Sequence, residues 1–176
     1  IHGICLHPAD NDGHVKFVYV VGYNATHNLD YDALPPKDYK TVAPQAFQEE
    51  GGAFVMQVDL DSMTVVWEDK IVGSTIEAID CAVTDDGEDL YVVGHVGDDQ
   101  ALPDKESKGG DDVWIRMYNT LGGIPQWGHQ LGSDKDEELA RGGAIVVDSD
   151  NNAIIYGNTK GSMGRVRAED LERPDN

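Results

Sequence analysis

Short apolar runs, separated by acidic or glycine-containing turns, follow one another along the whole chain. The run at 15–21 is typical, because only Lys16 interrupts its apolar residues. Runs of this length, rich in Val, Ile, Tyr and Trp and bounded by Gly, Asp and Asn, favour β-strands. Helix is weakly supported: prolines break 33–36, and only 136–139 and 168–172 fit a turn or two of helix. The pattern predicts strands at 1–7, 14–23, 51–59, 63–72, 76–84, 88–96, 112–119, 124–131, 141–148 and 152–158.

These strands recur as copies of one unit. The stretch 81–94 aligns with 144–157 without a gap, and each copy is an apolar run, an acidic turn, a second apolar run and a glycine. A weaker copy with a slightly longer turn ends at Gly22. Because each copy has the same order of parts, the pattern indicates an internal repeat.

A second repeated unit follows the first. Its aromatic residues Phe54 and Trp67 are both matched 60 residues later, by Trp114 and Trp127. Four short antiparallel strands in roughly 60–70 residues are the sequence form of a β-propeller blade. We therefore predict an all-β fold made of about two and a half four-stranded antiparallel blades of an incomplete, larger β-propeller. A stacked sandwich of the same hairpins is the alternative.

The blade pattern divides the chain into four parts. The first blade takes 1–72 and includes a long insert at 24–50, the second takes 73–131, half of a third takes 132–162, and a polar tail takes 163–176. The insert is longer than its counterpart in the second blade, and loops of that length tend to be functional or disordered. We expect the insert to pack as an ordered lid that carries part of any partner contact.

The two ends of the repeat predict an incomplete ring. The chain begins at Ile1 without an initiator Met or an apolar leader, so we expect a processed product, an excised piece or the ordered part of something longer. Two and a half blades do not close a propeller, and the strand at 152–158 would keep an unpaired apolar edge. We expect 1–176 not to fold as an isolated soluble monomer, but to need the rest of a parent chain or neighbouring copies.

The second and third units resemble a known family. The likeness rests on V-W-I-R-M-Y at 113–118, Q-W at 126–127, L-G-S at 131–133 and A-I-V-V-D-S-D-N-N-A-I-I-Y-G at 144–157. These pieces resemble the SBBP-type beta-propeller repeat of seven-bladed propellers, over roughly residues 51–162 with a weaker echo in 1–24. The sequence departs from that repeat at Asp150, where the family has a turn glycine, and in the long insert. The resemblance implies a secreted or cell-surface protein whose repeats serve scaffolding or adhesion and share no catalytic residues.

Charge narrows the range of partners. The chain carries 33 acidic and 13 basic side chains, a formal net charge of −20 at pH 7. Such a charge repels phosphate backbones, so we expect no nucleic-acid partner. No apolar run approaches the roughly 18 residues that span a bilayer, so we expect no membrane span in this segment. The acidity suits a solvated extracellular or cell-surface location.

The acidic turns offer a candidate calcium site. Asp148, Asp150 and Asn152 place oxygen ligands at alternate positions, which is a fragment of the pattern that Ca²⁺ needs. The alternative is turn chemistry, because Asp, Asn and Gly fill hairpin turns for conformational reasons. None of the acidic turns supplies the terminal bidentate Glu of a complete calcium loop.

The sequence also raises two questions of covalent modification, glycosylation and disulfide formation. Asn24 begins an N-x-T sequon in what reads as a loop after a strand, so it is a glycosylation candidate in a secreted chain. Cys5 and Cys81 occupy corresponding places on the first strands of consecutive blades. We expect buried free thiols, because such strands usually lie too far apart for a disulfide, which secretion would otherwise allow.

Catalytic signatures are missing. The chain has no G-x-S-x-G, H-E-x-x-H or G-x-x-x-x-G-K motif, and we expect its six histidines in exposed loops. Trp67 and Trp127 recur at one blade position and Trp114 matches Phe54, and this repeated placement predicts core between blades rather than a sugar-stacking surface. The sequence thus predicts a non-catalytic structural or binding module that contacts protein or glycan through loops such as 24–50 and 97–111. The alternative is part of an enzymatic propeller whose active site is completed by blades not in this chain.

Overall fold

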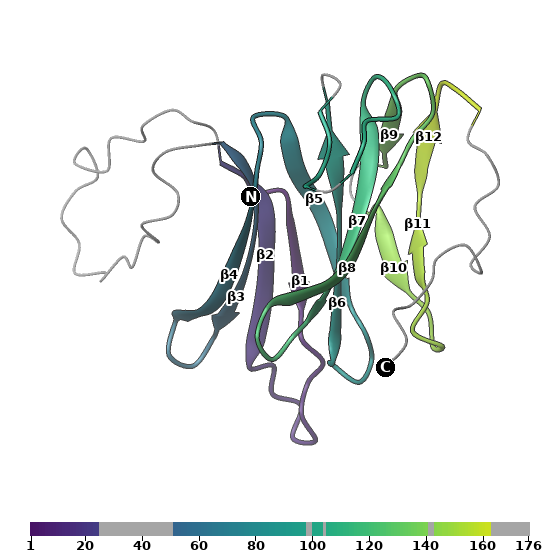
Figure 1. Ribbon diagram of the computed structural model, residues 1–176. Coiled ribbons are helices and arrows are strands. Elements are labelled where there is room, and N and C mark those ends of the chain that lie inside the picture. Colours follow the sequence, from purple (N-terminus) through teal and green to yellow (C-terminus); the bar gives the residue numbers. More distant parts are fainter. Residues whose placement is uncertain (25–50, 98–99, 104, 141–142, 163–176) are drawn as a thin grey trace.

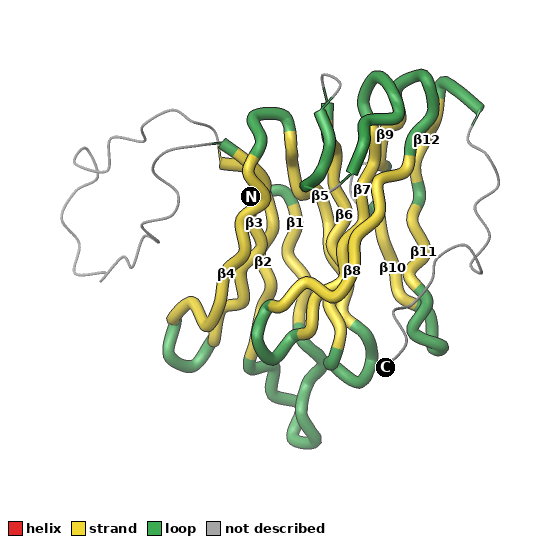
Figure 2. Tube along the Cα trace, viewed as in Figure 1, coloured by secondary structure: helices red, strands yellow, loops and turns green. Residues whose placement is uncertain are grey.

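The computed structural model describes residues 1–24, 51–97, 100–103, 105–140 and 143–162 (Figure 1). These residues form strands, turns and loops, all strand pairs are antiparallel, and none of the described residues is helical (Figure 2). The prediction of an all-β fold with four-stranded antiparallel sheets is confirmed. The described part of the chain holds no helix of the length and apolarity needed to cross a bilayer.

Two complete sheets come first in the chain. The first contains β1 (Gly3–Leu6), β2 (Phe17–Asn24), β3 (Gly52–Asp59) and β4 (Thr64–Val72). The second contains β5 (Ile76–Val83), β6 (Asp89–Val96), β7 (Asp112–Asn119) and β8 (Ile124–Leu131). In both sheets the strands lie in chain order, so each sheet is a simple meander.

A third unit follows as two short strand pairs. It contains β9 (Glu137–Leu139), β10 (Ile145–Val147), β11 (Ala153–Ile155) and β12 (Gly157–Thr159), with β10 paired to β11 and β9 paired to β12. The amide of Ala140 donates to the Tyr156 carbonyl, and the Tyr156 amide donates to the Ala144 carbonyl. These bonds join the two pairs, so β9 and β10 form one interrupted inner strand. Residues 136–139, which fit a turn of helix by sequence, lie in or next to β9 instead.

The alignment of the repeat also needs a correction. Cys81 pairs with Val92 in the second sheet, whereas Ile145, and not Ala144, pairs with Ile155 in the third unit. Val83 pairs with Leu90 and Val147 pairs with Ala153, so six residues separate the last pair of the β5–β6 hairpin and five separate that of the β10–β11 hairpin. The gap-free alignment therefore holds for the second strand of each hairpin but is shifted by one residue on the first.

The three units stack face to face. One buried cluster fills the space between the first and second sheets, and it includes Tyr19, Val55, Val92 and Trp114. A second cluster lies between the second sheet and the third unit, with Trp127 packed against it, and Trp67 packs against the first cluster. The prediction that all three tryptophans pack between units is confirmed.

The inner strands of the units are neighbours. Both β1 and β10 contact β5. Figure 1 shows the first sheet, the second sheet and the third unit in that order from left to right. The described sheets do not close into a ring, so the propeller itself stays a prediction.

Candidate functional site

A disulfide joins the inner strands of the first two sheets. Cys5 of β1 is bonded to Cys81 of β5, and their Cα atoms are 5.9 Å apart, within the usual range of about 4.4–6.8 Å. The prediction of free thiols is therefore wrong. Its premise of equivalent positions is wrong as well: Cys5 pairs with Tyr19, which faces the second sheet, but Cys81 pairs with Val92, which faces the first sheet.

An irregularity in β5 explains this geometry. The pairing register of β5 shifts between Ala78 and Asp80. A shift of one residue moves every later side chain to the opposite face of a strand. Cys81 consequently points back toward the first sheet, where Cys5 meets it.

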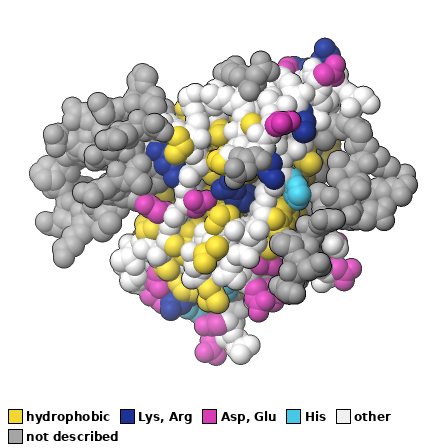
Figure 3. Space-filling view, viewed as in Figure 1, with side chains coloured by type: hydrophobic (Ala, Val, Ile, Leu, Met, Phe, Trp, Pro, Cys, Tyr) yellow, Lys and Arg dark blue, Asp and Glu magenta, His cyan; other side chains and the backbone are white. Residues whose placement is uncertain are grey.

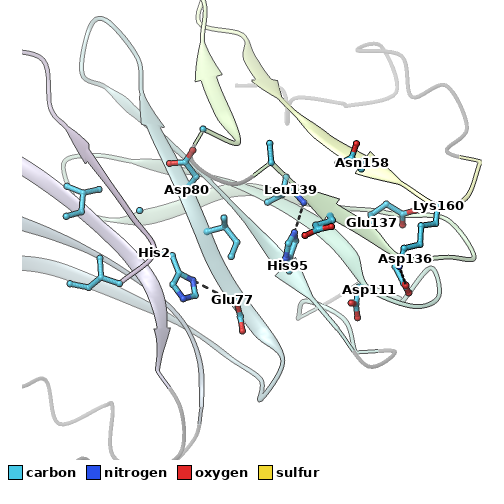
Figure 4. A pocket seen from close by; sticks show the side chains of 17 residues that line it. His2, Glu77, Asp80, His95, Asp111, Asp136, Glu137, Leu139, Asn158 and Lys160 are labelled. Atoms are coloured by element: carbon cyan, nitrogen blue, oxygen red, sulfur yellow. Dashed lines mark hydrogen bonds and ion pairs between the residues drawn. The ribbon is translucent and has the colours of Figure 1, made fainter.

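A pocket of about 910 Å³ lies close to this junction. Its walls come from the beginning of β1, the first half of β5, the end of β6, the residue before β7, and from β9 and β12 (Figure 4). These are the strand ends opposite the hairpin turns. The pocket carries six carboxylates: Glu77, Asp80, Asp111, Asp136, Glu137 and Glu138. Its basic side chains are Lys160 and two histidines, so the lining is acidic.

The two histidines of the pocket make different contacts. His2 lies with Nδ1 3.1 Å from the carbonyl oxygen of Ala78 and 4.0 Å from the Glu77 carboxylate. His95 accepts a 2.7 Å hydrogen bond at Nε2 from the backbone amide of Leu139. This bond needs an unprotonated Nε2, and it ties β6 of the second sheet to β9 of the third unit.

Burial favours the neutral form of His95. Desolvation lowers the pKa of the ring below its ordinary value, and the negative charges of Glu77, Glu138 and Asp111 oppose that effect. His95 was expected in an exposed loop, and this prediction is wrong because the residue lies within β6 and is half-buried.

Several carboxylates of the pocket already serve the fold. The buried Glu137 side chain accepts hydrogen bonds from the amide and hydroxyl of Ser133, at 2.7 and 2.6 Å, and from the Thr159 hydroxyl at 2.6 Å. Asp136 forms an exposed 2.8 Å ion pair with Lys160, which lowers the pKa of Asp136 and raises that of Lys160.

Asp80 connects two units. Its Oδ1 accepts a 2.9 Å bond from the Cys81 amide, and its Oδ2 accepts a 2.7 Å bond from the Ala144 amide. A single carboxylate thus fixes the irregular part of β5 and the start of the third unit. The pocket is acidic, so its electrostatic potential favours a positively charged ligand group over an anion.

The candidate calcium residues lie in the turn between β10 and β11. Asp148 Oδ1 accepts 2.9 Å bonds from the amides of Asp150 and Asn152, and the Asn152 side-chain amide lies 3.1 Å from Oδ2. These bonds hold the Asp148 pKa below its ordinary value. They are the contacts of a self-capped turn, and the calcium site stays a prediction. Among the described residues, no group of three or more His, Cys, Asp or Glu could hold a metal ion.

The same turn geometry recurs at one end of the molecule. Asp10 accepts from the amides of Asp12 and His14, and Asp59 accepts from the amides of Asp61 and Ser62. Acidic side chains gather along the lower edge in Figure 3, which is where Figure 1 places the hairpin turns. The carboxylates of these turns and the carboxylates of the pocket therefore lie at opposite ends of the sheets.

The remaining candidates lie around the second strand-to-strand loop of each sheet. Asn24, the glycosylation candidate, is the last residue of β2. The other sequon residues and the rest of the predicted lid, 25–50, lie outside the described residues. In the loop 97–111, Leu102 is buried and its amide donates to the Gln130 side chain. Gln130 in turn donates to the buried Asp112 carboxylate, so this part of the loop is fixed to the second sheet.

Comparisons with known proteins give no family for this chain. No protein-family model matches the chain, and no curated protein matches it.

Proposed function

We propose that this chain is a non-catalytic structural module of a secreted or cell-surface protein, in which four-stranded sheets stack in the manner of β-propeller blades. The observation that carries the proposal is the disulfide between Cys5 and Cys81, which fastens the first sheet to the second at their inner strands. Disulfides persist in oxidising compartments and are rare in the cytosol. A bond placed at the sheet junction stabilises the stack itself.

Polar contacts across the same junction support a structural role. The hydroxyl of the buried Tyr118 donates a 2.9 Å bond to Asp69 of the first sheet, and Arg116 pairs with the same carboxylate at 3.3 Å. The Trp67 indole donates to the carbonyl of Thr120 at 2.9 Å. These polar contacts fix the position of the first sheet on the second, which is what a structural module requires.

A recurring pair of residues supports the blade interpretation. In the first sheet a Cβ on Gly22 would meet the Phe54 ring at 2.9 Å, and in the second sheet a Cβ on Gly94 would meet the Trp114 ring at 2.5 Å. Each glycine therefore makes room for the aromatic ring on the next strand. The same packing solution in two successive sheets is expected of duplicated blades.

The loops at the pocket end are the parts that we assign to partner contact. The loop 97–111 is anchored through Leu102 and Gln130, so it presents its exposed residues from a fixed base. A protein or a glycan would meet this loop beside the acidic pocket, where Glu77 and Asp111 lie. A rigid scaffold that positions loops is the usual arrangement of a binding module.

The test compares oxidised and reduced protein. The full chain is produced in a bacterial periplasm and in a bacterial cytosol, together with a Cys5→Ser/Cys81→Ser double variant. The disulfide closes a sequence separation of 76 residues, which in the chain-entropy model contributes about 4.5 kcal/mol. We expect the periplasmic protein to melt roughly 10 °C above the double variant.

The controls separate the bond from the side chains. Cytosolic protein with reduced thiols is expected to match the double variant, and oxidation is expected to restore its melting temperature. Equal melting temperatures for the oxidised, reduced and doubly substituted proteins would refute the proposal.

A further inference from the structure

The two faces of each unit can be compared along the repeat. We name the face turned toward the next unit the C-side face and the face turned toward the preceding unit the N-side face. On the C-side face of the first sheet, Tyr19 and Val21 are fully buried against the second sheet. Their counterparts Tyr91 and Val93 are buried against the third unit.

The C-side face of the third unit has no such cover in the described structure. Ile154, the counterpart of Tyr91, has 52% of its surface exposed, and its pairing partner Val146 has 57% exposed. Tyr156 next to them is also exposed. An apolar face that two earlier units bury is thus open at the end of the stack.

On the N-side faces the exposed unit is the first one, and not the last. Leu90 and Val92 of the second sheet are fully buried against the first sheet. The equivalent residues of the first sheet, Val18 and Val20, are only half-buried. Beside them on β1, Leu6 has 59% of its surface exposed. The first sheet therefore presents open apolar residues of the kind that the second sheet buries.

We propose that these two open faces bind each other in successive copies of the chain, so that the third unit of one copy packs on the first sheet of the next. The inference rests on the proposed stacking module and names its partner: a second copy of this chain. At both junctions between units a C-side face packs on an N-side face, and among the described residues one open face of each type remains. A second copy supplies the missing complement to both.

Such a contact is head-to-tail. It joins two different surfaces, so it is heterologous and leaves an open face at each end of a pair. Depending on the angle between copies, the chain of contacts closes into a ring or continues. In the described structure β11 pairs only with β10, so its other edge is unpaired there as well.

The experiment uses two single substitutions and their mixture. Leu6→Asp places a charge on the N-side face of the first sheet, and Ile154→Asp places one on the C-side face of the third unit. Leu121→Asp is the matched control, because Leu121 is 90% exposed in the β7–β8 turn, away from both faces. Light scattering and sedimentation over a range of concentrations measure the mass of each protein.

The expected results are specific to a head-to-tail contact. The wild-type chain and Leu121→Asp associate beyond the monomer, and each face variant alone associates at least about tenfold more weakly. Mixing the two face variants restores association, but only to dimers, because each retains one intact face.

Other outcomes overturn the inference. A wild-type chain that stays monomeric at all concentrations contradicts it. So does a face variant that associates like wild type, which would indicate a symmetric contact through the other face alone. Circular dichroism and the intact Cys5–Cys81 bond are checked in every sample, so that a folding failure is recognised. A monomer that keeps its disulfide and its redox-dependent melting temperature refutes the head-to-tail contact and leaves the proposed function standing.

Discussion

Cys5 points from the first sheet toward the second, and Cys81 points from the second sheet back toward the first, so one disulfide closes the layer between them. The two residues hold similar places in the repeat but opposite faces of their strands. The register irregularity between Ala78 and Asp80 produces this difference. The same Asp80 carboxylate binds the first amides of the next inner strand, so one irregular site organises the junctions on both sides of the second sheet.

A methyl group on Gly94 is expected to disrupt the second sheet. Its Cβ would lie 2.5 Å from the Trp114 ring and would also contact the Glu77 carbonyl oxygen. Because Trp114 is fully buried, its ring has no room to withdraw. We expect Gly94→Ala to lower the free energy of unfolding by about 2–3 kcal/mol, measured by chemical denaturation.

The matched control is Gly122→Ala. A Cβ there meets only the Ile124 side chain, at an ordinary 3.6 Å, in an exposed turn. We expect a change within about 0.5 kcal/mol. Equal effects at the two glycines would show that the contact between Gly94 and the Trp114 ring has been misplaced.

Because the Tyr118 hydroxyl donates to Asp69, we expect removal of this hydroxyl to lower the free energy of unfolding. In Tyr118→Phe the ring stays in the core, but the 2.9 Å bond to the Asp69 carboxylate disappears. We expect a loss of about 1–2 kcal/mol in the free energy of unfolding. Tyr156→Phe, at a position with 70% of its surface exposed, is expected to change it little.

Alkaline pH is expected to act on the same contact. Burial, together with the Asp69 charge, raises the pKa of Tyr118 well above its ordinary value of 10.0. Above pH 10 the unfolded chain therefore releases this proton while the folded chain keeps it, so the free energy of unfolding falls as the pH rises. The fall should be smaller in Tyr118→Phe. Identical profiles for the two proteins between about pH 9 and 11 would contradict this account.

His95 predicts a sensitivity to mild acid. Burial lowers the pKa of its ring from the ordinary 6.5, so below that pH the unfolded chain binds a proton that the folded chain refuses. Stability contributed by His95 is present above pH 6.5 and is lost as the pH falls toward the folded pKa. Protonation also removes the acceptor for the Leu139 amide.

The variant His95→Gln isolates this effect. Its amide oxygen can still accept from the Leu139 amide, but it does not titrate. We expect wild type to lose stability between about pH 6.5 and 5 and the variant to lose less, by urea denaturation at each pH. His129, whose pKa burial also lowers, remains in both proteins and cancels in the comparison. A steeper loss in the variant would exclude the proposed role of the ring.

Local pattern was enough to predict most of the strands. The run predicted at 51–59 is β3 at Gly52–Asp59, and the run predicted at 124–131 is β8. In these strands the apolar residues and the bounding turns carry the information. β9 was missed because Glu137 looks like a surface residue, whereas its carboxylate is buried by bonds to Ser133 and Thr159 that only the tertiary fold supplies.

The pocket and the disulfide depend on longer-range relationships. His95, Glu77 and Lys160 come from strands and loops of two different units, and no spacing in the sequence brings them together. The polar residues Glu77 and Asp80 within an otherwise apolar strand were the available signal for the pocket. The register shift that turns Cys81 has no counterpart in the pattern of apolar residues, so the bond could not be predicted from it.

The central claim is that the first two sheets stack with Cys5 and Cys81 facing each other. Peptide mapping of the oxidised full chain by mass spectrometry, without reduction and with free thiols alkylated first, tests it most directly. The account predicts one pair of peptides linked through Cys5 and Cys81, separable only after reduction. Recovery of both cysteines as alkylated, unlinked peptides from protein kept under oxidising conditions would contradict it.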